Sequence, residues 1–182
     1  RAGMWNSDGF TALPNLGEGG AAFSGSADRV CGVSYGFPQG GRATVWDATG
    51  AHLITGLDGL DSIAWNINAG GTYVGHGVDR STSPPTARSF VGQNGSATLL
   101  DYPGFNTFRA FDINDDGWIA GLWNTGTNLT RHAYVARGDE IMDLGFLPGA
   151  EGMSATSINN DRTVAGYSLR GGSRDKAVIW PN

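Results

Sequence analysis

Hydrophobic and polar positions alternate along this chain in short runs, and turn residues separate the runs. Runs of this kind cover 1–5, 42–46, 88–92 and 132–136, and turn pairs such as Asp8-Gly9 and Asn94-Gly95 follow some of them. Asp-Gly and Asn-Gly pairs favour hairpins because both residues accept a positive φ. No stretch keeps an apolar period of 3.6 residues. The pattern therefore predicts an all-β chain of short antiparallel strands, with no helix longer than a turn.

One segment of this pattern occurs four times. Its skeleton is an Ala, an Ile three residues later, an Asn directly after the Ile, and a Gly eight residues after the Ile. Clear copies begin at Ala64, Ala110 and Ala155, and a worn copy begins at Ala21, with Ser24 and Gly25 in place of the Ile and Asn. The copies begin 43, 46 and 45 residues apart. A period of roughly 20 to 50 residues indicates a repeat architecture.

Each copy predicts a hairpin of two strands, which we name c and d, with the Asn in the turn between them. Two further predicted strands, a and b, precede each hairpin. Strand a occurs five times, at 1–5, 42–46, 88–92, 132–136 and 176–180. Strand b occurs four times, at 11–16, 51–54, 97–100 and 140–144.

Four strands in about 45 residues, joined by short turns, form an antiparallel meander that cannot bury a face alone. Packed around an axis, such meanders become the blades of a β-propeller. We predict one domain over 1–182, a four-bladed propeller with units at 1–41, 42–87, 88–131 and 132–176 and a closing strand at 176–180. The first a–b hairpin would complete the blade begun by the last c–d pair. The alternatives are a five-bladed propeller and a fragment of a larger one.

Composition narrows the functional classes. With 182 residues, of which 40% are hydrophobic, the chain can bury one core. A net charge of −5 argues against a nucleic-acid partner. Cys31 is the only cysteine, which excludes an intrachain disulfide, and its place in the repeat predicts a buried small residue. No apolar run approaches the ~18 residues of a membrane span. The first residue is Arg1 rather than Met, so we expect a processed or excised piece.

The chain resembles the HAF-repeat family of bacterial extracellular proteins. The resemblance rests on four stretches, His132-Ala-Tyr134, Met142-Asp-Leu-Gly145, Ser157-Ile-Asn159 and Val164-Ala-Gly-Tyr-Ser168. It is best over 131–180 and poor over 20–34. The resemblance implies a propeller-like array that is secreted or attached to the cell surface. It implies no catalytic residue, because the family has no common activity.

A calcium loop is one candidate site. Asp112, Asn114 and Asp116 have the spacing of the first ligands of such a loop. The loop also needs a bidentate acid near its twelfth position, where this chain has Trp123. The same segment is the third copy of the c–d hairpin, in which Asn and Gly are turn residues. We therefore favour turn chemistry, and we expect no metal ion and no cofactor.

A basic side chain stands four residues before the end of every predicted strand a. Around a propeller axis, these residues would form a ring of cations that binds carboxylate, sulfate or phosphate groups. The alternative is that each cation pairs with a carboxylate of a neighbouring blade or shields an edge strand. The residues are Arg1, Arg42, Arg88, His132 and Lys176.

The tryptophans suggest a carbohydrate ligand, because sugar rings stack on aromatic faces. Trp118 and Trp123 lie beside predicted strands c and d, whereas Trp5, Trp46 and Trp180 share one position of strand a. Equivalent weak sites in several blades would gain affinity through avidity. The alternative for the strand-a set is packing between blades.

Enzyme chemistry has one candidate, the segment 75–85, which departs most from the repeat. We predict that it is a loop carrying His76, Asp79, Arg80 and Ser81, and the alternative is a long surface connection without a specific role. The three His residues lie in different copies without metal-ligand spacing. Our leading interpretation is non-catalytic binding of a carbohydrate or a small anionic ligand. The alternatives are a small propeller lyase or hydrolase, and a structural or protein-interaction repeat.

Overall fold

The computed structural model describes residues 2–6, 9–26, 28–38, 40–102, 104, 107–125 and 128–182, and every element in them is a β-strand. The chain begins with a hairpin of β1 (Gly3–Asn6) and β2 (Gly9–Ala12). Sheet I consists of β3 (Gly19–Ser26), β4 (Arg29–Phe37), β5 (Gly40–Asp47) and β6 (Gly50–Leu53). Sheet II consists of β7 (Asp61–Ile67), β8 (Tyr73–Asp79), β9 (Thr86–Gln93) and β10 (Ser96–Leu99). Sheet III consists of β11 (Thr107–Ile113), β12 (Ile119–Thr125), β13 (Asn128–Arg137) and β14 (Glu140–Asp143), and sheet IV of β15 (Gly152–Ile158), β16 (Val164–Arg170) and β17 (Ser173–Trp180).

Each sheet is an antiparallel meander in chain order, and the order c, d, a, b holds in sheets I to III. Sheet IV has strands c, d and a. A single parallel pair, Thr107 with Ala87, joins sheets II and III into one eight-stranded sheet, of which they are the two halves. Among the described residues there are 17 strands, and they match the predicted five copies of strand a and four each of b, c and d. The all-β prediction is confirmed.

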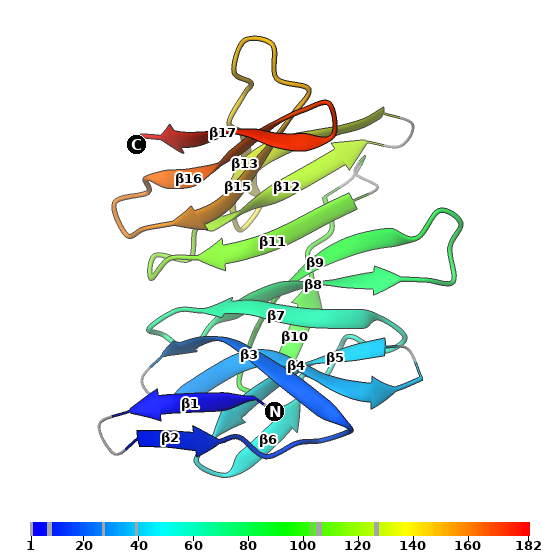
Figure 1. Cartoon of the computed structure of the whole chain (residues 1–182), viewed down its shortest axis with the longest axis vertical. Coiled ribbons are helices and arrows are strands. Elements are labelled where there is room, and N and C mark those ends of the chain that lie inside the picture. Colours follow the sequence, from blue (N-terminus) through cyan, green and yellow to red (C-terminus); the bar gives the residue numbers. More distant parts are fainter. Residues whose placement is uncertain are drawn as a thin grey trace.

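The sheets follow one another along the long axis of the molecule (Figure 1). The β1–β2 hairpin lies at one end of this row and β15–β17 at the other. β17 pairs with β16, and β1 pairs with β2 in a separate sheet. The first hairpin therefore does not complete the last blade as predicted, because β17 holds the place of strand a beside β16. The described strands form an open row of sheets.

The β1–β2 hairpin is an a–b hairpin of the same kind as the later ones. In all four a–b hairpins, the backbone N–H of the residue after strand b donates to the backbone carbonyl of the second residue of the predicted strand a. The four bonds run from Leu13 to Ala2, Ile54 to Ala43, Leu100 to Ser89 and Leu144 to Ala133, at 2.8–3.0 Å. This recurring bond closes each a–b hairpin at the same position.

A β-bulge in strand c recurs in all four sheets, directly after the residue that pairs with the strand-d glycine. In sheet II, Ala64 pairs with Gly75, and a Cβ on this glycine would lie 1.9 Å from the Ile63 carbonyl oxygen. Only glycine fits there. In sheet I the residue that pairs with Gly32 is Ala22, whereas the worn copy of the skeleton was placed from Ala21 in the sequence. The first copy therefore has a c–d turn that is one residue shorter.

Hydrophobic clusters fill the spaces between successive sheets. The cluster between sheets I and II includes Cys31, Ile54 and Phe90, and the cluster between sheets II and III includes Val74 and Tyr134. A third cluster lies between sheets III and IV. The core is thus divided among the interfaces, as expected for units that cannot bury a face alone. Cys31 is fully buried, as predicted, and burial raises the pKa of its thiol to about 12.

The outer face of sheet IV has no sheet against it among the described residues. Ala165 pairs with Ile179 there, and both side chains are exposed, Ile179 to 70%. The equivalent pair in sheet III, Ala120 and Val135, is buried, with exposed fractions of 0% and 7%. The same two positions therefore form core inside the row and surface at its end.

Candidate functional site

The segment considered for calcium is committed to contacts between sheets. The Asp112 carboxylate is 6% exposed and accepts hydrogen bonds from Ser157 Oγ at 2.8 Å and Ile158 N at 2.7 Å, both in sheet IV. The same carboxylate also accepts hydrogen bonds from Ile113 N at 2.8 Å and from the side-chain amide of Asn66 in sheet II. Asp112 is thus an acceptor shared by three sheets, and these donors occupy the oxygens that a metal ion would use.

An asparagine ladder runs beside Asp112. The Asn68 side chain donates to the Asn114 carbonyl, and the Asn114 side chain donates to the Asn159 carbonyl, each at 3.0 Å. Asn114 also closes its own turn by accepting from Trp118 N at 2.8 Å. Asp116 is exposed in this turn. The repeated Asn therefore joins neighbouring sheets as well as forming the turn. Among the described residues, no three His, Cys, Asp or Glu side chains gather in a way that could hold a metal ion.

The residues predicted to form a catalytic loop are separated by the fold. His76 lies inside β8, is 6% exposed and accepts a hydrogen bond from Trp65 Nε1 at 3.0 Å. Asp79 is the last residue of the same strand and accepts from Ser81, which lowers its pKa. Arg80 pairs with Asp61. The prediction of one loop carrying all three was wrong, because strand d extends through 79 in this copy.

The predicted cations occupy equivalent positions on their strands, but the row is open, so they do not surround an axis. Arg42 lies 3.6 Å from Asp58, and His132 Nδ1 lies 2.6 Å from Asp143 Oδ2. Both carboxylates belong to the cation's own unit rather than to a neighbouring one. Arg88 and Lys176 are exposed. Arg1 lies outside the described residues.

The tryptophans serve mainly as packing groups. Trp46 is 1% exposed and donates its indole N–H to Pro14 O at 2.8 Å, and Trp180 donates to Leu144 O at 3.0 Å. Trp118 is 7% exposed. Trp123 stacks on His132 with ring centroids 3.9 Å apart. The side chain of Trp5 lies outside the described residues.

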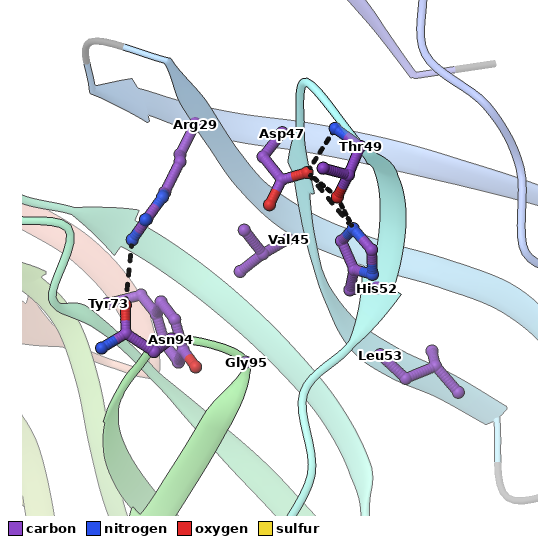
Figure 2. Close-up of a pocket in the computed structure, with 9 residues that line it drawn as sticks. All are labelled: Arg29, Val45, Asp47, Thr49, His52, Leu53, Tyr73, Asn94 and Gly95. Atoms are coloured by element: carbon purple, nitrogen blue, oxygen red, sulfur yellow. Dashed lines mark hydrogen bonds and ion pairs between the residues drawn. The ribbon is translucent and has the colours of Figure 1, made fainter.

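A polar recess opens between sheets I and II (Figure 2). Its volume is about 390 Å³. Sheet I supplies one wall from β4, β5 and β6, and sheet II supplies the other from the start of β8 and the β9–β10 turn. The lining residues are Arg29, Val45, Asp47, Thr49, His52, Leu53, Tyr73, Asn94 and Gly95.

One wall carries a hydrogen-bonded cluster in the β5–β6 turn. Asp47 Oδ1 accepts from Thr49 N at 2.8 Å and from the Thr49 hydroxyl at 2.6 Å. His52 Nε2 lies 2.8 Å from Thr49 Oγ1 and 3.2 Å from Asp47 Oδ1. The Thr49 bonds, followed by His52, lower the pKa of Asp47. The second Asp47 oxygen points toward the middle of the recess (Figure 2).

The opposite side of the recess is formed by Asn94 of sheet II and by the guanidinium of Arg29, whose side chain reaches there from β4 of sheet I. Arg29 Nη1 donates to Asn94 Oδ1 at 3.4 Å, and Arg29 Nε lies 3.9 Å from Asp28. Both distances are long for bonds to a guanidinium, which has five N–H donors. Val45 lies between the two polar groups (Figure 2). The recess therefore presents an acid, a cation, a hydroxyl and an amide around an apolar floor.

An equivalent recess opens between sheets III and IV, with a volume of about 150 Å³. The strand registers place Trp118 where Arg29 stands, Met142 where His52 stands and Asn182 where Asn94 stands. Between sheets II and III, Gly138 stands where Asn94 stands, and its carbonyl accepts a hydrogen bond from the Tyr102 hydroxyl at 2.6 Å. The position of the recess is thus repeated, while its chemistry is particular to sheets I and II.

Sequence reasoning did not find this site. The sequence pattern predicts no role for Arg29 or Asp47, and His52 is one of the three His residues that lack metal-ligand spacing. The one available signal was divergence, because strand a of the first full unit ends in an Asp-x-Thr turn followed by His52, which no other copy has.

Comparison with protein-family models gives no match for this chain, and comparison with curated proteins gives none either. In the described part of the chain, no helix has the length and apolar character needed to cross a membrane.

Proposed function

We propose that this protein is a non-catalytic carbohydrate-binding module whose site is the polar recess between sheets I and II. The observation that carries the proposal is the arrangement of Asp47, Thr49 and His52 opposite Arg29 and Asn94. Saccharides present vicinal hydroxyls and apolar C–H patches. A recess with a fixed carboxylate, an amide, a cation and an apolar floor matches both features.

The same cluster argues against the alternative of a hydrolase. The Thr49 hydroxyl has one hydrogen and donates it to Asp47, so His52 Nε2 must donate to Thr49 rather than accept from it. An activated nucleophile needs the opposite arrangement, with the base accepting the hydroxyl proton and a third group orienting the base through its other nitrogen. The cluster therefore positions hydrogen-bonding groups without activating Thr49.

Isothermal titration calorimetry with saccharides first selected on a glycan array tests the proposal. The Asp47→Asn variant keeps the size of the side chain but removes its charge, and we expect its affinity to fall about tenfold or more, since a hydrogen bond to a charged group contributes about 1.5–3 kcal/mol. Asp139→Asn is the matched control, because Asp139 is an exposed acid near the β13–β14 turn. If both variants bind as the wild type does, the recess is not the site.

We also propose that the sheets are blades of a four-bladed propeller, as their repeat indicates. The blade-like order c, d, a, b and the uncovered outer face of sheet IV support this. Closure would bring that face against β3. Spin labels at Ile179 and Phe23 test this directly, because a ring gives a short distance between labels and an open row gives one that spans the molecule. Membership of the HAF-repeat family and a secreted or cell-surface location are proposals that rest on the sequence motif alone.

A further inference from the structure

We propose that the saccharide bound in the recess carries a carboxylate, as a uronic acid unit does, and that Arg29 selects it. This inference rests on the proposed function and specifies its ligand class. It is carried by the weakly held guanidinium of Arg29 together with the open carboxylate oxygen of Asp47 on the far side of the recess.

Arg29 is held in place but left with donors for a ligand. Its side chain is 33% exposed, and its two polar neighbours stand at 3.4 Å and 3.9 Å. Arg80, by comparison, contacts Asp61 through both Nε and Nη2. A carboxylate matches the guanidinium geometry and can accept two parallel hydrogen bonds from it. The Asn94 amide would lie beside such a carboxylate.

The backbone of sheet II makes room for this arginine. A Cβ on Gly71 would lie 2.9 Å from Arg29 Nη1, and Gly71 also has a φ of +77° that favours glycine. The side chain therefore passes over the c–d turn of sheet II to reach Asn94. Arg29 thus reaches the recess across the boundary between the two sheets.

Asp47 binds a different part of the ligand. Its Oδ1 is occupied by Thr49 and His52, and no described residue donates to its Oδ2. A carboxylate oxygen accepts readily from sugar hydroxyls, but it repels a second carboxylate. The acid group of the ligand must therefore face Arg29, and its hydroxyls must face Asp47. This polarity sets the orientation of the sugar as well as its class.

Matched glycosides test the proposal. Methyl β-D-glucuronide and methyl β-D-glucoside differ at C6, which is a carboxylate in one and a hydroxymethyl group in the other, and methyl α-D-galacturonide and methyl α-D-galactoside form a second pair. We expect the wild type to bind one uronide at least tenfold more tightly than its neutral partner, with the preference falling as salt is raised. Arg29→Gln should remove the preference, because it should lower the affinity for the uronide at least tenfold more than the affinity for the neutral sugar, and Arg29→Lys should restore part of the preference. Inorganic sulfate at the same concentration should not compete.

The outcomes separate the two proposals. Equal affinity of the wild type for both members of each pair overturns the uronate inference and leaves carbohydrate binding in place. A preference that persists in Arg29→Gln, with unchanged thermal unfolding, overturns the role of Arg29. Strong competition by sulfate shows a simple anion site instead. If no glycoside binds the wild type, the proposed function falls, and the inference with it.

Discussion

Asp112 is the residue whose removal tests most directly how the sheets are held together. Its carboxylate accepts four hydrogen bonds, from Asn66, Ile113, Ser157 and Ile158, and so connects sheets II, III and IV. Asp112→Ala leaves the buried backbone N–H groups of Ile113 and Ile158 without this acceptor. Each unsatisfied buried group costs about 1–3 kcal/mol, so we expect a loss of about 3 kcal/mol in the free energy of unfolding.

Urea unfolding at constant pH measures this loss, provided that the dependence on denaturant is unchanged. Asp116→Ala is the matched control, because it removes the same charge from an exposed position in the same hairpin, and we expect a change of about 0.5 kcal/mol or less. Free energies of unfolding within about 0.5 kcal/mol of each other for the two variants would contradict this prediction. The Asp112 carboxylate would then not be a buried acceptor between sheets.

Three further predictions follow from burial and strand geometry. Val135→Ala should lower the free energy of unfolding by about 2 kcal/mol, and a loss of about 0.5 kcal/mol or less would contradict its burial. Ile179→Ala at the equivalent exposed position should change the free energy of unfolding by about 0.5 kcal/mol or less in an open row of sheets, whereas a loss as large as that of Val135→Ala would support the closed propeller proposed above. Gly75→Ala should lower the melting temperature strongly, because a Cβ at this position would lie 1.9 Å from the Ile63 carbonyl oxygen. Gly19→Ala is the control, since a Cβ there has no neighbour within 4 Å, and it should leave the melting temperature nearly unchanged. Equal melting temperatures for the two variants would contradict the bulge geometry. His76 has its pKa lowered to about 4 by burial and then by a nearby arginine, so its neutral form stabilises the fold above pH 6.5 and this stabilisation is lost as the pH falls toward 4. Its ring should titrate near pH 4 by NMR, and titration above pH 6 would refute the burial.

The repeat explains how much of the fold could be predicted. Turn pairs and glycines mark each hairpin locally, so the strands and their order followed from the sequence. The register of sheet I did not, because its turn is one residue shorter and the bulge hides the shift between Ala21 and Ala22. The place of the first hairpin was also predicted wrongly, because strand a occurs at both ends and the sequence does not say which copy pairs with β16.

The candidate site could not be predicted for a different reason. It lies between two units, and its walls come from β4, the β5–β6 turn and the β9–β10 turn. Arg29 and Asn94 are 65 residues apart and meet only when sheets I and II pack. The repeat motif instead indicates Asp112 and Asn114 as candidate ligands, but their polar atoms form hydrogen bonds between neighbouring sheets. Polar side chains within the motif build the fold, and those at divergent positions line the recess.

The most direct test of carbohydrate binding in the recess is an NMR titration of the ¹⁵N-labelled wild-type protein with the glycoside that binds best. The Thr49 amide, which donates to Asp47, and the Gly95 amide, on the opposite wall, report on the two sides of the recess. We predict that both shift in a saturable manner and that Asp47→Asn weakens the titration. Shifts confined to residues around Trp123 and His132, or the absence of any saturable shift, would contradict the account.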